Sequence, residues 1–313
     1  MKKIVFMGTP QFSVPILEAL VNNENIQIEA VVTQPDRKVG RKKVLTAPPV
    51  KEAALKHDLK VLQPEKISGS KEMQSIIDMN PDLIVTAAYG QFLPEILLEA
   101  PTYKSINVHA SLLPKYRGAA PIHYAIWNGD QKTGISIIYM TKAMDAGDVL
   151  ARREIDIDRS DDTGKLFNKL SIVGRDLLMD TLPNLFNETI SPEPQDDSLA
   201  TYSPMISKEQ EQLDWEEEAE ALFNKIRAFR PFPGTYTLLD DKRFKVWDSE
   251  VANQTTEKAP GTIVKMTNEK LYVACGKGTV LSLLVVQPAG KQKMTVDSYL
   301  LGANLEVGDS FGE

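Results

Sequence analysis

Short apolar runs alternate with amphipathic segments through the first half of the chain. Each run is long enough for one buried strand, and the segments between them carry apolar residues at helical spacing. This alternation is the pattern of a mostly parallel sheet with helices on its faces. We therefore predict a doubly wound, Rossmann-like α/β domain, with strands at residues 3–8, 28–33, 82–87, 105–109 and 134–139 and helices at 11–23 and 48–57.

The second half of the chain has a different pattern. Residues 191–206 combine three prolines with polar residues and little periodicity, which is typical of a linker. A helix is predicted on each side of it, at 163–187 and at 215–230. Five short strands then favour a small β-barrel, at 234–239, 244–248, 262–265, 271–275 and 280–287. The predicted domains are thus 1–190 and 207–313, joined by the linker 191–206.

Composition narrows the class of protein. A chain of 313 residues with 42% hydrophobic and 25% charged residues is typical of two globular domains. The single cysteine, Cys275, excludes an internal disulfide, and three scattered histidines indicate no structural metal. The apolar run at the N-terminus is too short for a secretory signal and no stretch approaches a membrane span, so we expect a cytoplasmic protein.

The charge distribution excludes a uniform nucleic-acid-binding surface. The net charge is −7, and residues 206–313 hold 13 Lys and Arg against 17 Asp and Glu. One basic run stands out, since no acidic residue lies between Asp36 and Glu52; its cations are Arg37, Lys38, Arg41, Lys42 and Lys43. Such a run is most often a solvated loop. A local RNA contact is the alternative.

The strongest chemical signal follows the predicted strand 105–109. Asn107 and His109 are two residues apart on that strand, so their side chains project from the same face near its carboxyl end, where α/β sheets bind ligands. The loop after the next predicted strand carries Asp145 and Asp148, either of which could orient His109. An amide donor, an imidazole and a carboxylate are what acyl transfer to an amine requires.

At these residues the chain resembles the folate-dependent formyltransferases. The shared features are Asn-x-His followed by Ser-Leu-Leu-Pro, and a later Asp in a strand-end loop. The resemblance covers nearly the whole chain, since it also includes Gly8-Thr-Pro10, Gln34-Pro-Asp-Arg37, Ala88-Tyr-Gly90, the run from Asn107 to Pro121, Arg227-Ala-Phe-Arg-Pro-Phe-Pro233 and Gln287-Pro-Ala-Gly-Lys291. It is greatest to the members of the family that act on tRNA.

The resemblance implies a reaction and a catalytic set. The formyl donor is 10-formyltetrahydrofolate, and the acceptor is the α-amino group of methionine on initiator tRNA. Asn107 would donate to the developing oxyanion, His109 would move protons and stabilise charge, and Asp145, rather than Asp148, would orient the imidazole. The direction of each proton transfer stays open. No G-x-S-x-G elbow surrounds Ser111, so we do not expect a serine nucleophile.

The resemblance also implies where the two substrates bind. The folate would lie against the segment Ser111, Leu112, Leu113 and Pro114, with Tyr89 and Gly90 completing the wall. Within the tRNA-acting members, the basic run 37–43 becomes a tRNA-binding loop, with Arg41 as its foremost member. The C-terminal barrel would be OB-like and would contribute a local patch, drawn from Lys225, Arg227, Arg230, Lys291 and Lys293. We expect a monomer without metal.

Three other functions fit parts of the sequence. The first domain alone is compatible with a formyltransferase for a small amine such as glycinamide ribonucleotide, or with a formyltetrahydrofolate hydrolase that uses water. The second domain, the basic run and Arg227–Pro233 favour tRNA instead. A purely RNA-binding protein with a degenerate α/β scaffold is disfavoured by the acidic barrel and by the intact set Asn107, His109 and Asp145.

Overall fold

The computed structural model of the protein describes residues 1–40 and 42–312. The chain forms two compact units. The first comprises residues 1–121, 132–156 and 167–203, and the second comprises 122–131, 157–166 and the chain from 204 onward. The division is therefore not a single cut: two short segments from the middle of the chain belong to the second unit, and most of the predicted linker 191–206 belongs to the first.

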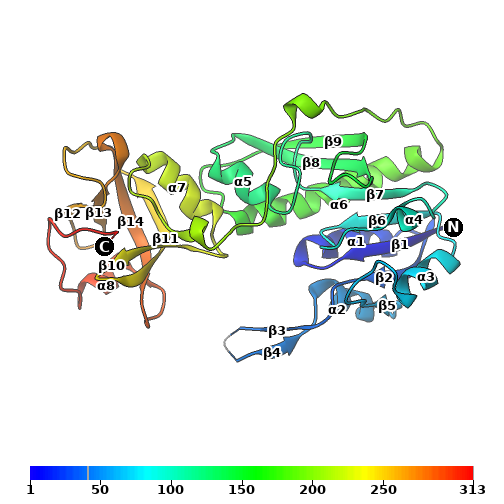
Figure 1. Ribbon diagram of the computed structural model, residues 1–313, viewed down its shortest axis with the longest axis horizontal. Coiled ribbons are helices and arrows are strands. Elements are labelled where there is room, and N and C mark those ends of the chain that lie inside the picture. The colour runs from blue at the N-terminus through cyan, green and yellow to red at the C-terminus, as the bar shows by residue number, and fades with distance from the viewer. Residues whose placement is uncertain (41, 313) are drawn as a thin grey trace. The chain divides into compact units, whose positions relative to one another are not determined.

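The first unit contains a seven-stranded sheet in the order β5-β2-β1-β6-β7-β8-β9 (Figure 1). Strands β5, β2, β1, β6 and β7 are parallel, which confirms the mostly parallel α/β sheet. The order turns back between β1 and β6, and the carboxyl ends of these strands are where such folds bind ligands. The bounds are β1 Lys2–Gly8, β2 Ile26–Val32, β5 Val61–Leu62, β6 Leu83–Ala87, β7 Ser105–His109, β8 Lys132–Tyr139 and β9 Val149–Asp156.

Helices cover the sheet because its central strands are apolar on both faces. All five residues of β6 are buried, as expected of a parallel strand with helices on each side. On one face the helix α6 packs so closely that a Cβ atom at Gly174 would lie 3.0 Å from Val108 and 3.6 Å from Ile135. The helices of this unit are α1 Val14–Val21, α2 Pro49–Lys56, α3 Lys71–Asp78, α4 Glu95–Leu98 and α6 Thr163–Phe186, whose first four residues belong to the second unit, with a 3-10 turn at Gln11–Ser13; all but the first residue of α5 Pro121–Trp127 belongs to the second unit.

The last two strands of this sheet correct the expected geometry of the site. Strand β8 runs antiparallel to β7, with Asn107 opposite Ile138 and His109 opposite Ser136. The loop after β8 therefore begins at the opposite end of the strands from the loop after β7. The two loops do not start side by side, as had been expected. Strand β9, which sequence analysis missed, pairs antiparallel with β8.

The described cations of the basic run lie on a small hairpin, which sequence analysis also missed. Strand β3 Arg37–Val39 pairs antiparallel with β4 Val44–Thr46, and all six residues are exposed (Figure 1). The base of the hairpin is anchored by Asp36, which accepts hydrogen bonds from Gln63 and Lys51. The Gln63 and Lys51 hydrogen bonds lower the pKa of the Asp36 carboxyl. The base is thus held while the two strands project into solvent.

The second unit contains an antiparallel sheet in the order β10-β11-β14-β13-β12, with β15 beside β14. This confirms a C-terminal β domain after the α/β domain. The strands are β10 Thr235–Leu239, β11 Lys242–Val251, β12 Ile263–Met266, β13 Leu271–Ala274, β14 Val280–Pro288 and β15 Met294–Thr295. The helices are α7 Ala219–Ala228 and α8 Val296–Leu300, with 3-10 turns at Glu209–Glu211 and Gly276–Gly278; a fourth, Asp197–Leu199, belongs to the first unit.

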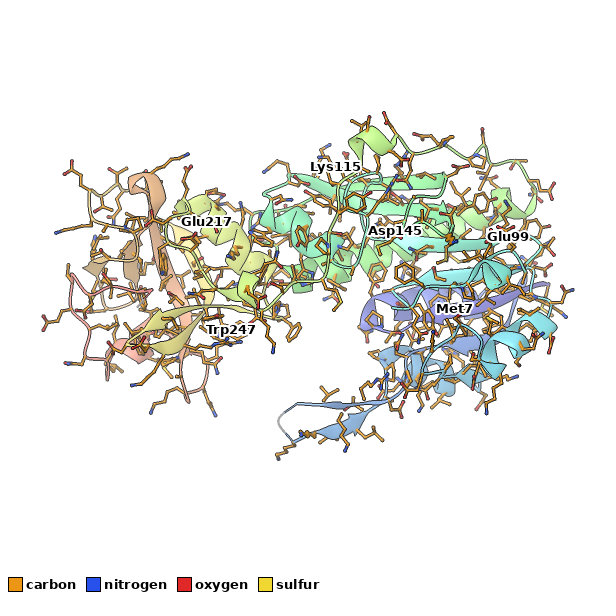
Figure 2. The ribbon with its side chains drawn as sticks, viewed as in Figure 1. Met7, Glu99, Lys115, Asp145, Glu217 and Trp247 are labelled. Carbon is orange, nitrogen blue, oxygen red and sulfur yellow. The ribbon has the colours of Figure 1, made fainter. Side chains whose placement is uncertain are left out.

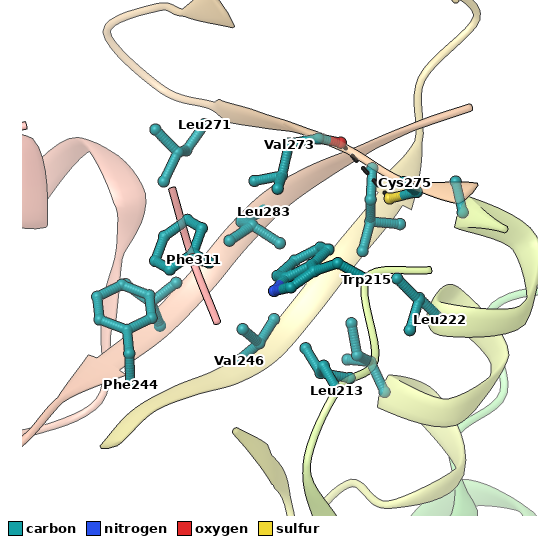
Figure 3. Packing of buried hydrophobic residues seen from close by; sticks show 14 of the residues in the cluster. Leu213, Trp215, Leu222, Phe244, Val246, Leu271, Val273, Cys275, Leu283 and Phe311 are labelled. Carbon is teal, nitrogen blue, oxygen red and sulfur yellow. Dashed lines mark hydrogen bonds between the residues drawn. The ribbon is translucent and has the colours of Figure 1, made fainter. Parts of the chain in front are cut away.

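The core of the second unit lies between this sheet and α7 (Figure 3). Trp215 stacks on Phe311 with ring centroids 5.9 Å apart, and Phe244 packs beside Phe311. Cys275 is buried in the same cluster, and burial raises the pKa of its thiol to about 12. The only cysteine is therefore a core residue rather than a nucleophile.

Within residues 1–40 and 42–312, no helix combines the length and apolarity needed to cross a membrane.

Candidate active site

Asn107 lies on β7 beside the buried strand β6. Its Oδ1 atom accepts a hydrogen bond from the Thr86 hydroxyl at 2.8 Å. Its Nδ2 atom donates to Asp145 Oδ1 at 3.4 Å, and because a carboxylate can only accept, this contact identifies the nitrogen side of the amide. Nδ2 carries two hydrogens. One faces Asp145, and the other can serve an acceptor on a substrate.

His109 ends β7 and is 5% exposed. Its Nε2 atom lies 2.9 Å from the carbonyl oxygen of Tyr116. A carbonyl can only accept, so Nε2 carries the hydrogen of the neutral ring and Nδ1 is the nitrogen that can take up a proton. Nδ1 lies 3.6 Å from Asp145 Oδ2. A proton gained there would meet a negative charge.

Asp145 reaches this position because the loop after β8 folds back along the sheet (its side chain is labelled in Figure 2). At Gly147 the backbone approaches β8 so closely that a Cβ atom would overlap the carbonyl oxygen of Tyr139. Asp145 itself has a φ of 50°, a left-handed conformation that Asp tolerates better than most residues. In this way the loop turns the carboxylate toward β7, although the loop starts at the end of the sheet opposite to the carboxyl end of β7.

The carboxylate of Asp145 is also fixed from the loop after β7. The backbone N–H of Gly118 donates to Asp145 Oδ2 at 2.9 Å. Gly118 has a φ of 121°, and a Cβ atom there would lie 2.8 Å from the carbonyl oxygen of Ser203. Only glycine fits this position without a shift of the backbone. Asp145 is thus held between Asn107, His109 and Gly118.

The predicted catalytic residues therefore come together within one site. Asp145, rather than Asp148, is the carboxylate beside His109; Asp148 is exposed, and its carbonyl accepts from the Tyr139 N–H at 3.0 Å. The arrangement offers an amide hydrogen for a developing negative charge and a buried imidazole backed by a carboxylate.

The segment predicted to contact folate is built from buried and accessible residues in alternation. Ser111 is fully buried and its hydroxyl donates to the Lys115 carbonyl, while Leu113 packs in the core. Leu112 and Pro114 are half-buried. The backbone is held from β8 and β9, because Ser136 bonds both Ser111 and Leu113 and Arg152 donates to the Leu113 carbonyl.

The second predicted wall differs from expectation in one residue. The ring of Tyr89 lies in the core at 4% exposure, and burial raises the pKa of its hydroxyl to about 12. Its carbonyl accepts from Thr9 and Gln34, which ties together the loops after β1, β2 and β6. Gly90 and Ala88 are exposed beside it. Any contribution of Tyr89 to a folate pocket would therefore come from its place in the loop, between the exposed residues Ala88 and Gly90, rather than from its hydroxyl.

The predicted tRNA-binding cations lie away from these buried groups, on the hairpin β3–β4. Lys38, Lys42 and Lys43 are exposed. Arg37 forms an ion pair with Glu65 at 2.8 Å, with side chains 60% and 73% exposed. Arg41 lies outside the described residues.

Two of the five cations predicted to form a patch in the second unit are internal and Arg230 is half-buried, which corrects that expectation. Lys225 and Arg227 are 4% and 6% exposed, and burial lowers the pKa of both. Lys225 donates to the Gln212 carbonyl, and Arg227 donates to the Asp158 and Asp161 carbonyls. Arg230 bonds the carboxylates of Asp162 and Asp248. Lys291 and Lys293 are exposed. Arg227 and Arg230 are therefore engaged within the second unit, whereas Phe232 of the same segment is 77% exposed.

Sequence analysis missed several residues that shape the site. Thr86 orients Asn107, and Met140 lies beside it, with Sδ 3.2 Å from the Thr86 hydroxyl. Gln195 bonds the backbone of the Asp145 loop, and Thr201 and Ser203 bond the loop around Tyr116. The last three lie in the segment predicted as a linker. Its proline content and lack of periodicity hid their contacts, because no local pattern marks a chain that binds loops distant in sequence.

The chain matches two family models over most of its length. The model described as "Formyl transferase" matches residues 1–182, and "Formyl transferase, C-terminal domain" matches residues 205–304. Among solved structures, the sugar 3N-formyl transferase WlaRD, in the presence of dTDP and 5-N-formyl-THF, has a TM-score of 0.68 at 17% identity, covering 93% of this chain and 99% of its own. An N-formyltransferase from Helicobacter canadensis has a TM-score of 0.69 at 16% identity, covering 94% of this chain and 100% of its own. The fold and these matches define a formyl transferase.

Curated relatives identify the group within this class. The methionyl-tRNA formyltransferase of Enterococcus faecalis is 55% identical over 309 residues, covering 99% of this chain and 98% of the relative. That of Bacillus subtilis is 50% identical over 312 residues, covering 100% and 98%. The chain belongs to the methionyl-tRNA formyltransferase family.

Proposed function

We propose that the protein transfers the formyl group of 10-formyltetrahydrofolate to the α-amino group of methionyl initiator tRNA, with Asn107, His109 and Asp145 as its catalytic groups. Family membership over nearly the full length carries the reaction. The observation that carries the catalytic assignment is the contact of Asp145 with both Asn107 and His109.

Each of the three residues has a task that its contacts support. The amine attacks as a free base, and negative charge develops on the formyl oxygen. Asn107 donates its free Nδ2 hydrogen to that oxygen, since its Oδ1 is already occupied by Thr86. Because the donor is oriented before the substrate arrives, little reorganisation is needed as the charge develops.

His109 and Asp145 accept the proton that the amine must lose. Nε2 of His109 is engaged by the Tyr116 carbonyl, so the proton enters the pair at Nδ1 or at the facing carboxylate of Asp145. When the proton lies on Nδ1, Asp145 stabilises the imidazolium and keeps the ring oriented. The Gly118 N–H holds the carboxylate in place during this step. The bond between the formyl carbon and the folate nitrogen then breaks, and the departing nitrogen takes up the proton, so that tetrahydrofolate leaves as the second product.

The accessible residues around this site suit a folate. The folate supplies a formyl group already activated on nitrogen. Leu112 and Pro114 offer half-buried apolar surface, and Gly90 and Ala88 leave exposed backbone for polar ring edges. Ser136 and Arg152 hold the Ser111–Pro114 backbone and so keep this wall rigid.

The tRNA contacts come from exposed or half-buried cations in each unit. Lys38, Lys42 and Lys43 lie on a projecting hairpin with no burial to hold them, which suits phosphate contact; we assign Arg41 to the same function from its sequence position. In the second unit, Lys245 and Lys293 each lie 5.0 Å from the ring centroid of Trp247, and Arg243 lies 4.2 Å from that of Tyr236. Cations beside aromatic faces suit RNA better than the internal Arg227 and Arg230 do.

A direct assay tests this function. Purified protein is incubated with 10-formyltetrahydrofolate and methionyl initiator tRNA, and formylmethionyl-tRNA is measured. Parallel reactions replace the tRNA with glycinamide ribonucleotide or omit every acceptor. We expect product only with the charged tRNA. Faster formylation of the ribonucleotide, or equal formyl loss to water without any acceptor, would replace the proposal with one of those two activities.

A further inference from the structure

The segment predicted as a linker crosses the catalytic loops. We call residues 193–203 the strap. At its start, Glu193 and Val149 exchange two backbone hydrogen bonds. At its end, Ser203 bonds Arg117 and Ala120 through its backbone, and Thr201 bonds Pro114 and Arg117 in the same way. The strap therefore joins β9 to the loop after β7, and it passes over the loop that carries Asp145.

Gln195 is the strap side chain that touches the Asp145 loop. Its Nε2 atom donates to the carbonyl oxygens of Asp145 and Gly147, each at 2.7 Å. Its Oε1 atom accepts from Nε and Nη2 of Arg117 at 3.0 and 2.9 Å. Arg117 is 4% exposed and lies one residue before Gly118, whose N–H holds the Asp145 carboxylate. One amide thus joins both loops that fix Asp145.

We infer that Gln195 is a positioning residue for catalysis: it holds the backbone of Asp145 so that the carboxylate stays between Asn107 and His109. The inference rests on the proposed role of Asp145. The loop needs such a restraint for two reasons. It starts at the end of the sheet opposite to the carboxyl end of β7, and Asp145 has a left-handed φ of 50°. The carbonyl of the buried Gly147 also gains the donor that a buried carbonyl requires.

Gln195→Glu separates this role from a merely structural one. Glutamate keeps the shape and can keep the contact with Arg117, now as an ion pair. It replaces the donating nitrogen with an oxygen that faces two carbonyl oxygens, so the hold on the Asp145 loop is lost and a repulsion is added there, while the contact with Arg117 can remain. If Gln195 served mainly to hold Arg117 and the strap, this variant would be as active as the wild type.

The expected result is a loss in kcat of about 10- to 100-fold, since displacing a reacting group by about 1 Å can cost about 100-fold. The Kd of the folate should change by less than about threefold, because the Ser111–Pro114 segment is held by other residues. Leu199→Glu is the matched control: it adds the same charge to the same strap at a side chain that is 63% exposed. Its kcat should equal that of the wild type.

Coupling to Asp145 provides the readout that a structural role would not move. In an Asp145→Asn background, Gln195→Glu should lower single-turnover formyl transfer by less than about threefold, since there is no longer a carboxylate to position. Losses that multiply in the double variant would overturn the inference. If Gln195→Glu lowers the melting temperature by more than about 5 °C, Gln195→Ala replaces it, because alanine brings no oxygen against the two carbonyls.

The outcomes also separate this inference from the proposed function. An active Gln195→Glu enzyme beside an inactive Asp145→Asn enzyme would overturn the role of Gln195 alone. Full activity of Asp145→Asn would overturn the catalytic role of Asp145 and this inference with it. A wild-type protein that formylates only a small amine would change the acceptor, whereas the loss in Gln195→Glu would still be expected.

Discussion

Two regions of the first unit hold the side chains that we propose for catalysis and for tRNA binding in opposite ways. Around Asp145, buried groups are fixed by hydrogen bonds from four segments: β6, β7, the Gly118 loop and the strap. On the hairpin β3–β4, the described cations Arg37, Lys38, Lys42 and Lys43 are exposed, and the ion pair of Arg37 has both side chains mostly in solvent. Bond formation needs donors oriented in advance, whereas phosphate contact needs charge within reach.

The catalytic side of this comparison should show the largest effect. Asn107→Ala removes the proposed oxyanion donor and is expected to lower kcat by about 100- to 1,000-fold. Folate binding should change little, because the contact strengthens only as charge develops. His109→Ala should lower kcat by a similar factor. Steady-state kinetics and a direct folate-binding titration measure the two quantities; near-normal kcat in either variant would contradict the assignment.

A matched pair of carboxylates tests the same region more finely. Asp145→Asn keeps the side-chain shape and removes the charge that faces His109, so we expect kcat to fall by about 100-fold. Asp148→Asn, three residues on, alters an exposed side chain and should leave kcat within about threefold of the wild type. The reverse order of losses would mean that the wrong carboxylate has been named.

The hairpin should show a smaller effect that falls on one substrate. The triple variant Arg41→Ala, Lys42→Ala, Lys43→Ala is expected to raise the KM for tRNA about tenfold and to leave folate binding unchanged. The log–log salt dependence of tRNA affinity should flatten by about one unit for each phosphate that loses its cation. The control removes three exposed lysines elsewhere in the unit, Lys56, Lys66 and Lys71. Equal slopes for the two triple variants would mean that the hairpin cations are only solvated surface residues and do not contact the tRNA phosphates.

The smallest effect concerns stability. The Arg37–Glu65 ion pair is exposed on both sides, so a double-mutant cycle with alanine at each position should give a coupling free energy below about 1 kcal/mol. Chemical denaturation of the four proteins measures it. A coupling of several kcal/mol would mean that the hairpin is held as firmly as the catalytic loops.

Most of the fold could be predicted because the apolar pattern of a buried strand depends only on residues that are neighbours in the chain. The apolar run 105–109 coincides with β7, and the runs near 82–87 and 280–287 differ from β6 and β14 by one residue. Strands β3, β4, β5, β9 and β15 were missed. They are short or half-exposed, so their residues lack the continuous apolar pattern on which the prediction depends.

The sequence by itself determined the class of fold, the Asn-x-His pair and the later Asp, because strand periodicity and motif spacing are local properties. Only the tertiary structure decided that β8 runs antiparallel, that the Asp145 loop folds back over the sheet, and that Gln195 in a proline-rich segment holds it. It also decided that Arg227 is internal and Lys38 exposed. The physical reason is common to all four: strand direction, loop path and burial depend on contacts between residues far apart in the chain, which local composition and spacing do not encode.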